Sequence, residues 1–275
     1  MNTSLKVLQL KARHQVYTLL SGNNLSRLHG EGYDFAELRE YQMGDDIRKI
    51  NWTITAKLGK PYIKTLHANR ELSVAVAALM DGSLYFGRDN AKQTKLTEVA
   101  TLLAYAAQYH GDLFNGLGYT PEKMLLTPPT KHLFHIEKFS KELYAAPLLG
   151  TTLDIQASLK NLFSRLHKPS LLFILGDFLD EADLSLLAQK HEVIALIIRH
   201  REEEQPRKLG EAVLRNPKNT EQRETCFDRR SIVRYRANLE AHDTKMIAHF
   251  ARYDIRYVKL FTDESPVEKL LNLFR

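Results

Sequence analysis

The 275-residue sequence contains a single cysteine, Cys226. One cysteine excludes an internal disulfide, and it also excludes a zinc site built from several thiolates. The apolar runs are all of strand length, so none of them predicts a helix that crosses a membrane. The start of the sequence has no long apolar centre and no small-residue cleavage site, so no signal peptide is predicted. We therefore expect a cytoplasmic protein of bacterial type.

Motifs of several enzyme classes are also missing. There is no Gly-x-x-x-x-Gly-Lys segment to cradle a phosphate, and the 11 histidines show no metal-binding spacing such as His-Glu-x-x-His. Cys226 has no histidine near it in the sequence, and a lone cysteine is more often inert than nucleophilic. We therefore expect no catalytic activity, and a metal-dependent hydrolase is the weaker alternative.

The balance of charge is basic, with a net charge of +6 and a pI of about 9.2. Such a balance is compatible with binding to nucleic acid or to an acidic partner. However, the positive charge looks dispersed along the sequence, and no zinc-finger spacing, RNA-binding aromatic signature or basic tail accompanies it. A nucleic-acid footprint should cluster, so we favour a solvated basic surface.

From residue 73 onward, short apolar runs alternate with segments of helical periodicity. Strands alternating with helices predict an α/β fold, with a mostly parallel sheet that helices cover on both faces. The predicted strands are Val74–Met80, 112–119, Leu171–Leu175, Val193–Ile198 and Ile255–Leu260. The predicted helices are 92–110, 130–143, 153–166, 184–190, 231–251 and 266–274. The polar segment 201–226 predicts a long loop that could hold a hairpin.

The first 70 residues have a different character. Residues 5–20 have the apolar spacing of an amphipathic helix. Residues 30–52 are dense in charge, aromatics and glycine without a sustained period, which indicates an ordered loop region with short strands. Residues 61–66 alternate enough for an edge strand. We expect 1–70 to be a helix-and-loop extension packed on a main domain of residues 71–275.

Oxygen-bearing side chains follow two of the predicted strands. Asp81 and Ser83 come directly after the first strand, and Asp177 follows Leu171–Leu175 in the same way. Open α/β sheets place their ligands at this carboxyl edge. Thr151 or Thr152, just before the helix at 153–166, could cap that helix or reach the same place. Carboxylates and hydroxyls are hard donors suited to magnesium or calcium, but aspartates also commonly end strands and threonines commonly cap helices.

One block in the first part of the sequence has a highly specific pattern, made of Gly32-Tyr33-Asp34-Phe35, Arg39-Glu40-Tyr41, Gly44-Asp45-Asp46, Arg48, Ile50-Asn51-Trp52 and Ala56-Lys57. This block resembles the signature of a known bacterial family, the domain-of-unknown-function family 58. The spacing from the signature block to Arg70-Glu71 and to Asp81-Gly82-Ser83 also matches, so the resemblance covers nearly the whole sequence.

This resemblance implies a von Willebrand factor A-like domain that acts as a partner or adaptor of MoxR-type AAA+ ATPases. It would also make four residues the equivalents of a metal-ion-dependent adhesion site that holds Mg²⁺ or another divalent cation: Asp81, Ser83, Thr152 and Asp177. We favour Thr152 over Thr151 from its distance to the following helix. The family's motif is Asp-x-Ser-x-Ser, but Tyr85 stands in place of the second serine. A phenol on a rigid ring is a poor substitute for a short hydroxyl donor, so the site could be degenerate.

The signature block has its own interpretations. The Gly44-Asp45-Asp46 turn could be an acidic partner-binding edge or a second divalent site, but we favour a turn that caps residue 47 onward and pairs with a neighbouring arginine. Trp52, the only tryptophan, is expected to be a packing residue. The candidate partner-binding or structural residues of this block are Arg39, Glu40, Tyr41, Asp45, Asp46, Arg48 and Trp52.

These observations together predict a protein-protein interaction module. A divalent cation at the carboxyl edge would leave an open coordination position for an acidic side chain of the partner. Two alternatives remain: a metal-independent scaffold on the same fold, which Tyr85 makes credible, and a nucleic-acid-binding protein, which only the pI supports.

Overall fold

The computed structural model describes residues 5, 7–9, 11–12, 35–43, 45–47, 50–66, 72–87 and 90–273, with side chains omitted at 35–39 and 64–66. The chain divides into two compact units. Residues 1–17 and 72–275 form the larger unit, and residues 18–71 form the smaller one. The N-terminal residues therefore group with the main domain rather than with the signature block. Packing of the rest of the extension on the main domain stays a prediction.

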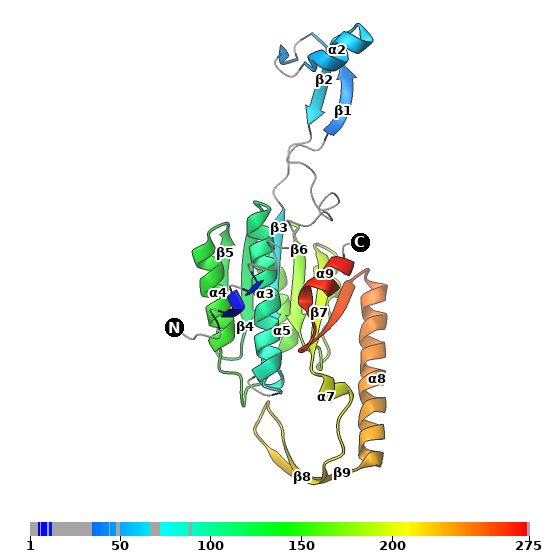
Figure 1. Ribbon diagram of the computed structural model, residues 1–275. Coiled ribbons are helices and arrows are strands. Elements are labelled where there is room, and N and C mark those ends of the chain that lie inside the picture. Colours follow the sequence, from blue (N-terminus) through cyan, green and yellow to red (C-terminus); the bar gives the residue numbers. More distant parts are fainter. Residues whose placement is uncertain are drawn as a thin grey trace. The chain divides into compact units, whose positions relative to one another are not determined.

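A six-stranded sheet is the centre of the larger unit (Figure 1). Its strand order is β10-β7-β6-β3-β4-β5, and all neighbours are parallel except β4 and β5. The predicted α/β class with a mostly parallel sheet is confirmed. The strands are β3 (Ser73–Leu79), β4 (Leu113–Tyr119), β5 (Met124–Thr130), β6 (Leu171–Gly176), β7 (Glu192–Arg199) and β10 (Arg256–Phe261).

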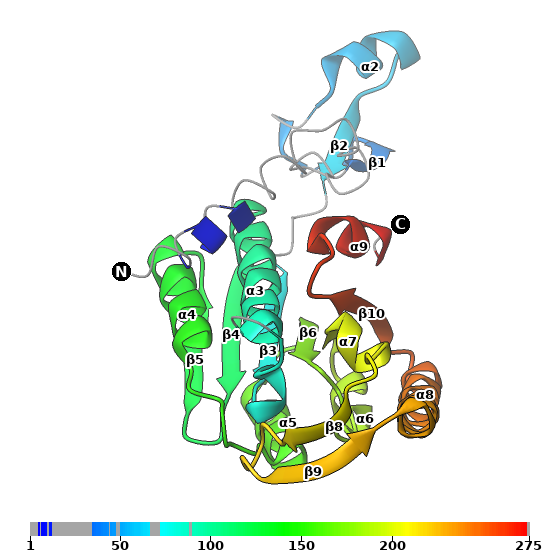
Figure 2. The ribbon, with the colours of Figure 1, turned by 60° about the horizontal axis from the view of Figure 1, so that its bottom comes forward.

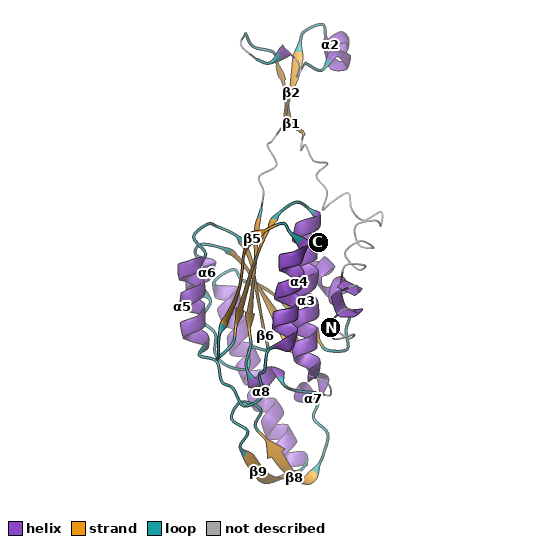
Figure 3. Cartoon of the chain, turned by 90° about the vertical axis from the view of Figure 1, so that its left-hand side faces the viewer, coloured by secondary structure: helices purple, strands orange, loops and turns teal. Residues whose placement is uncertain are grey.

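Helices cover both faces of this sheet (Figure 3). Helices α3 and α4 pack on one face, and α5, α6 and α8 contribute to the core on the other. The helices of the larger unit from residue 72 onward are α3 (Ala91–Tyr109), α4 (Leu133–Ala145), α5 (Ile155–Arg165), α6 (Ser185–Ala188), α7 (Arg201–Glu204), α8 (Arg229–Arg252) and α9 (Pro266–Leu273), with a 3₁₀ turn η3 at Gly82–Leu84.

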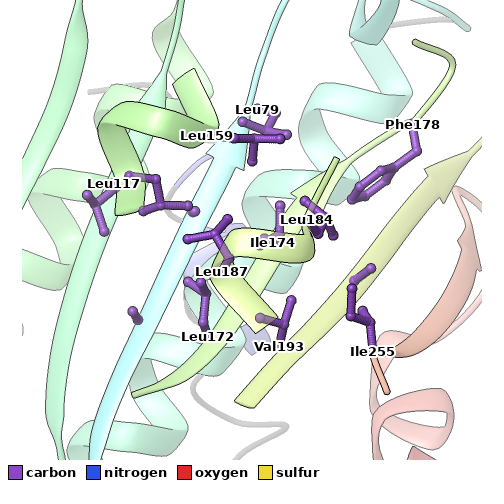
Figure 4. Packing of buried hydrophobic residues seen from close by; sticks show 14 of the residues in the cluster. Leu79, Leu117, Leu159, Leu172, Ile174, Phe178, Leu184, Leu187, Val193 and Ile255 are labelled. Atoms are coloured by element: carbon purple, nitrogen blue, oxygen red, sulfur yellow. The ribbon is translucent and has the colours of Figure 1, made fainter. Parts of the chain in front are cut away.

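The hydrophobic core explains why the central strands are uniformly apolar. Every residue of β3 after Ser73 is buried, as a strand with helices on both faces requires. Figure 4 shows the face on which Leu79, Leu172 and Ile174 of the strands meet Leu159 of α5. Burying a side chain of this size stabilises the fold by about 1.5–3 kcal/mol.

Two segments differ from their predicted structure. Residues 124–130 form β5, an antiparallel edge strand, although the sequence predicts a helix from residue 130. Pro128 and Pro129 obscured this strand, because prolines fit in a sheet only where no ladder hydrogen bond is needed, as at an edge. The segment 201–226, expected to be a long loop that could hold a hairpin, does hold one, formed by β8 (Gly210–Arg215) and β9 (Gln222–Phe227), and it differs from the expectation in the short helix α7.

The described residues near the N-terminus pack on the larger unit. Leu5, Leu8 and Ala12 are buried, and the ammonium of Lys11 lies 2.8 Å from the carboxylate of Glu98 on α3. Burial alone would raise the pKa of Glu98, but the hydrogen bonds and charges of Lys11 and Lys95 outweigh it and lower that pKa. The predicted helix at 5–20 is described only as far as residue 12.

The smaller unit is built around an antiparallel pair, β1 (Phe35–Glu40) and β2 (Tyr62–Leu66). Helix α2 (Trp52–Leu58) lies between them in the sequence, capped at its start by the Asn51 side chain and ended by Gly59 at φ +70°. Trp52 is 66% exposed, so the expectation that it is a packing residue was wrong.

The other signature residues have local roles or fall outside the description. The Asp45 carboxylate accepts a hydrogen bond from the Gln42 amide at 2.8 Å, so it closes a turn back toward residue 42. The expected capping from residue 47 onward involves residues 48 and 49, which lie outside the described residues, and stays a prediction. Glu40 pairs with Lys60 at 3.1 Å, and the Tyr41 amide donates to the carbonyl of residue 61. Asp46 is exposed, Arg39 is described only by its backbone on β1, and Gly44 and Arg48 lie outside the described residues.

Candidate functional site

The carboxyl ends of β3 and β6 are neighbours at the centre of the sheet. The chain passes from β3 to β4 on one side and later returns to β6 on the other side of β3. Open α/β sheets bind their ligands at such a reversal of strand order. Asp81 follows β3 and Asp177 follows β6, and both are buried. The strand order therefore brings these two aspartates to the same edge of the sheet, as the sequence predicts.

The turn after β3 holds Asp81 in a fixed orientation. Its Oδ1 accepts hydrogen bonds from the Ser83 amide at 2.9 Å and from the Ser83 hydroxyl at 2.6 Å, which starts the η3 turn. A cavity of about 10 Å³, roughly the space of one water, lies between Asp81, Ser83 and Asp177. Three of the four predicted ligands thus line one small space.

A buried lysine neutralises Asp177. Lys92, in the first turn of α3, is fully buried, and its ammonium lies 2.8 Å from Asp177 and 2.7 Å from Glu203 on α7. Burial alone would raise the pKa of Asp177, but the Lys92 ammonium, helped by a hydrogen bond from the Leu179 amide, lowers it below its ordinary value. Asp177 is therefore a carboxylate at neutral pH.

A second lysine reaches Asp81 from the hairpin of β8 and β9. The ammonium of Lys218, in the turn between these strands, lies 3.0 Å from Asp81 Oδ2 and also pairs with Asp180. Burial lowers the pKa of Lys218, but its hydrogen bonds to Asp180 and Asp81 raise it overall. In Figures 1 and 2 this hairpin lies at one end of the larger unit, beyond the sheet.

The backbone of the hairpin turn packs directly on the loops of the edge. The Gly150 amide donates to the Pro217 carbonyl at 2.8 Å, and a Cβ on Gly82 would lie 2.2 Å from that same oxygen. Only glycine at residue 82 allows this approach. The hairpin is therefore part of the site, and it covers the turn that carries Asp81.

The threonines do not complete a ring of ligands. Thr152 is exposed, and its hydroxyl donates to the Lys218 carbonyl at 3.4 Å. The Thr151 hydroxyl donates to the Leu148 carbonyl at 2.7 Å. Tyr85, which replaces the second motif serine, is 42% exposed.

The donors of this edge do not fit a divalent cation in the observed arrangement. Both oxygens of Asp81 are engaged, by Ser83 and by Lys218, and both oxygens of Asp177 are engaged, by Lys92 and by the amide of residue 179. Each carboxylate already has a cation beside it. Within the described residues, no group of three or more His, Cys, Asp or Glu side chains could hold a metal ion.

Both lysines come from parts of the chain that lie far in the sequence from the aspartates with which they pair. Lys92 stands 85 residues before Asp177, on α3, and its side chain is buried rather than exposed to solvent. Lys218 lies in a polar turn of ordinary composition. No local pattern distinguishes either residue from a surface lysine. Only their position in the folded chain does.

Comparison with known proteins identifies the family. The family model described as "Protein of unknown function DUF58" matches residues 37–246. The chain belongs to this family. Uncharacterized proteins of Mycobacterium tuberculosis and Mycobacterium bovis are each 25% identical to it over 233 residues, which are 82% of this chain and 73% of the relative. The matched residues include the signature block from Arg39 onward, both aspartates of the edge and the hairpin that covers them.

Two solved structures resemble this family member in fold. A conserved hypothetical protein BatB from Bacteroides thetaiotaomicron has a TM-score of 0.44 at 10% identity, covering 74% of this chain and 95% of that one. An aerotolerance-related membrane protein from Bacteroides fragilis has a TM-score of 0.42 at 9% identity, covering 74% and 98%. Among the described residues of this chain, no helix has the length and apolar character to cross a membrane.

A second cluster of charge lies on the hairpin and on α8. Residues 205–236 contain nine Lys and Arg against four Asp and Glu, a net charge of +5 out of +6 for the whole chain. All nine basic residues except Lys218 are exposed. Most of the 39 basic residues lie elsewhere in the chain, where acidic residues offset them, so it is the net excess of positive charge that gathers on the hairpin and the first turns of α8.

Proposed function

We propose that this member of the family is a cytoplasmic protein-protein interaction module of von Willebrand factor A type, which acts as a partner or adaptor of a MoxR-type AAA+ ATPase. Family membership and the parallel sheet with Asp81 and Asp177 at its carboxyl edge support this proposal. We propose no enzymatic activity, because both carboxylates are engaged by lysines and neither is free to act as a base.

The proposal takes a metal-independent form on the strength of one observation. Lys92 and Lys218 each place an ammonium against one of the two carboxylates that a divalent cation would need. A tethered ammonium supplies the neutralising charge without an exchangeable ion. The edge would then work as a rigid protein surface, with the hairpin turn as part of it.

The metal-dependent form is the second candidate. The observation that favours it is that Asp81, Ser83 and Asp177 line the same small cavity. Binding of Mg²⁺ there requires Lys218 to leave Asp81, since one oxygen cannot serve both cations at close range. The two forms therefore predict opposite effects for the loss of the Lys218 charge.

The test measures binding of the purified chain to a purified MoxR-type AAA+ ATPase, by biolayer interferometry in Mg²⁺ and nucleotide. Removal of Mg²⁺ with a chelator would give an ambiguous result, because a AAA+ ATPase itself binds Mg²⁺ with its nucleotide. Substitutions in this chain are therefore used instead of a chelator. The variants are Asp81→Asn and Lys218→Gln, and Glu137→Gln on the exposed face of α4 is the control. Titration of Mg²⁺ into the chain alone provides a second measurement.

In the metal-independent form, Asp81→Asn and Lys218→Gln weaken ATPase binding to a similar extent, about tenfold, since both break the same ion pair. Neither protein then gives a saturable Mg²⁺ titration. In the metal-dependent form, Asp81→Asn weakens binding, whereas Lys218→Gln strengthens it and gives a saturable Mg²⁺ titration. A wild-type chain that does not bind the ATPase at all contradicts the adaptor proposal in both forms.

A further inference from the structure

A groove of about 650 Å³ opens between the start of α8 and the segment that leads into β8. Lys208 lines it from that segment, and Arg229, Arg230 and Arg234 line it from the first turns of α8. It lies outside the carboxyl edge, and none of the edge residues Asp81, Ser83 or Asp177 contributes to it. The groove is the place where the excess positive charge of the chain is most concentrated.

The four cations of this groove are not used by the fold. Lys208, Arg229, Arg230 and Arg234 are all exposed, and in the part of the chain that the structure describes none of them forms an ion pair. Other cations of the same region are engaged: Lys218 binds two aspartates, and Lys259 binds Asp243 and Glu204. Asp228 is the one acidic side chain among the lining residues, so four cations against one carboxylate leave three positive charges in excess, and an anionic ligand would neutralise them.

Aliphatic side chains are exposed among these cations. Val233 lines the groove between Arg230 and Arg234 and is 63% exposed, and Leu209 beside Lys208 is 57% exposed. Arginine is enriched in protein-binding surfaces, where it binds carboxylates in a bidentate way, and the exposed aliphatic side chains beside it can supply apolar contact.

We propose that this groove binds an acidic segment of a partner protein that carries aliphatic side chains between its carboxylates. Arg229, Arg230 and Arg234 hold the carboxylates, and Val233 and Leu209 receive the aliphatic groups. This interface is separate from the carboxyl edge and does not depend on the identity of the ATPase partner. It would give the chain two faces for two proteins.

The composition of the groove disfavours nucleic acid as the occupant. Single-stranded nucleic acid binds by stacking its bases on exposed aromatic side chains. The aromatics nearest the groove, Phe227 and Tyr235, are half-buried and contact each other edge to face at 6.4 Å. Asp228 lies in the groove wall and would repel a phosphate, whereas a protein segment can place an amide or hydroxyl beside it.

The test uses three probes: a synthetic helical peptide with Glu and Leu on one face, the same peptide with Ser in place of Leu, and a single-stranded DNA of equal charge. Binding is measured by isothermal titration calorimetry. A fluorophore on Cys226, the single and exposed cysteine on β9, gives an independent local signal. The groove variants are Arg230→Glu/Arg234→Glu and Val233→Ser. The matched control is Lys138→Glu/Lys141→Glu, which makes the same change in net charge on exposed positions of α4.

We expect the Glu-Leu peptide to bind the wild type and to lose about 30-fold in affinity with Arg230→Glu/Arg234→Glu, against less than about twofold for the α4 control. Val233→Ser should lower the affinity for the Glu-Leu peptide about fivefold and leave the affinity for the Glu-Ser peptide unchanged, because only the Glu-Leu peptide makes the aliphatic contact. Arg230→Gln/Arg234→Gln keeps the length and helix propensity of both positions, so it separates lost contacts from a misfolded helix, which circular dichroism also checks.

Three outcomes would overturn the proposal. Equal weakening by the groove and α4 variants means that the peptide responds to net charge alone. DNA that binds more tightly than the Glu-Leu peptide makes the groove a nucleic-acid site. A wild type that binds neither peptide, with all proteins folded, leaves the groove without the acidic protein ligand that we assign to it.

Discussion

At the scale of single residues, Lys92 is the centre of the edge. Its ammonium is buried together with the carboxylates of Asp177 and Glu203. The second oxygen of Glu203 accepts a hydrogen bond from the His200 amide at 2.8 Å. Burying three charges costs several kcal/mol per ion, and only close pairing and complete hydrogen bonding offset that cost. Removal of Lys92 therefore leaves both carboxylates without a compensating cation.

We expect Lys92→Met to destabilise the protein by about 3–5 kcal/mol at neutral pH, because it leaves two buried carboxylates without a cation. The effect should depend on pH. In the wild type the folded pKa of Asp177 is lowered, so its stabilising contribution is present above its unfolded pKa and is lost as pH falls through the folded pKa. In the variant, burial raises that pKa, so protonation relieves the cost. Urea unfolding at pH 7 and near pH 4.5 measures this effect. The difference in the free energy of unfolding between wild type and Lys92→Met should be smaller at the lower pH.

The control adds Asp177→Asn and Glu203→Gln to the Lys92→Met variant. These changes remove the buried charges and keep the shape of the side chains, so they should restore much of the lost stability. Equal free energies of unfolding for Lys92→Met and wild type at neutral pH would mean that water reaches the three groups and that their charges are not buried together.

The sequence predicted part of this site for a physical reason. Asp81 and Asp177 follow apolar runs, and parallel strands bring their carboxyl ends to one edge, so their meeting follows from local pattern and topology. The lysines that pair with them depend on tertiary contacts across the chain. Those contacts leave no local signal, because a lysine in a helix or a polar turn is normally a solvated residue.

At the scale of secondary structure, the hairpin of β8 and β9 is the element that changes the interpretation of the edge. Its strands have no apolar face in the sequence, and their side chains are mostly exposed, so periodicity gave little sign of them. What fixes the hairpin is its turn, which docks on Gly82 and Gly150 and delivers Lys218 to Asp81. The central strands were predictable because burial on both faces demands continuous apolar runs.

We expect Gly82→Ala to displace the hairpin turn, because the added methyl group would lie 2.2 Å from the Pro217 carbonyl oxygen. Overpacking against backbone of this kind costs about 1–3 kcal/mol. The local readout is amide hydrogen exchange at Gly150, whose N–H donates to that same carbonyl. Its protection should fall in the variant, and trypsin should cut more rapidly after Lys218.

Gly176→Ala is the matched control at the same edge. A Cβ at residue 176 would lie 3.5 Å from the Leu79 Cβ, which is an ordinary contact, so hairpin protection should be unchanged. Unaltered exchange at Gly150 in the Gly82→Ala protein would show that the turn is held by other contacts than its approach to the edge.

At the scale of the whole molecule, the chain begins and continues in the same compact unit, with residues 18–71 as a separate one between its parts. The interruption could not be read from composition, because residues 1–17 and the signature block both lack the alternating pattern of the main domain. Leu5, Leu8 and Ala12 are instead buried in the larger unit, and Lys11 supplies a cation for the buried carboxylate of Glu98 on α3.

This division predicts different outcomes for two deletions. Replacement of residues 18–71 by a short Gly/Ser linker keeps Leu5 and Leu8 in place and should change the free energy of unfolding of the larger unit by less than about 1 kcal/mol, since loop closure depends only weakly on length. Removal of residues 1–71 exposes the apolar surface that Leu5 and Leu8 cover and leaves Glu98 without Lys11. Burial of two leucines contributes up to about 3–6 kcal/mol, so this shorter protein should unfold at a clearly lower urea concentration. Urea unfolding followed by circular dichroism measures both. If the two deletions are equally destabilising, residues 18–71 themselves support the larger unit, as the packed extension predicted from the sequence requires.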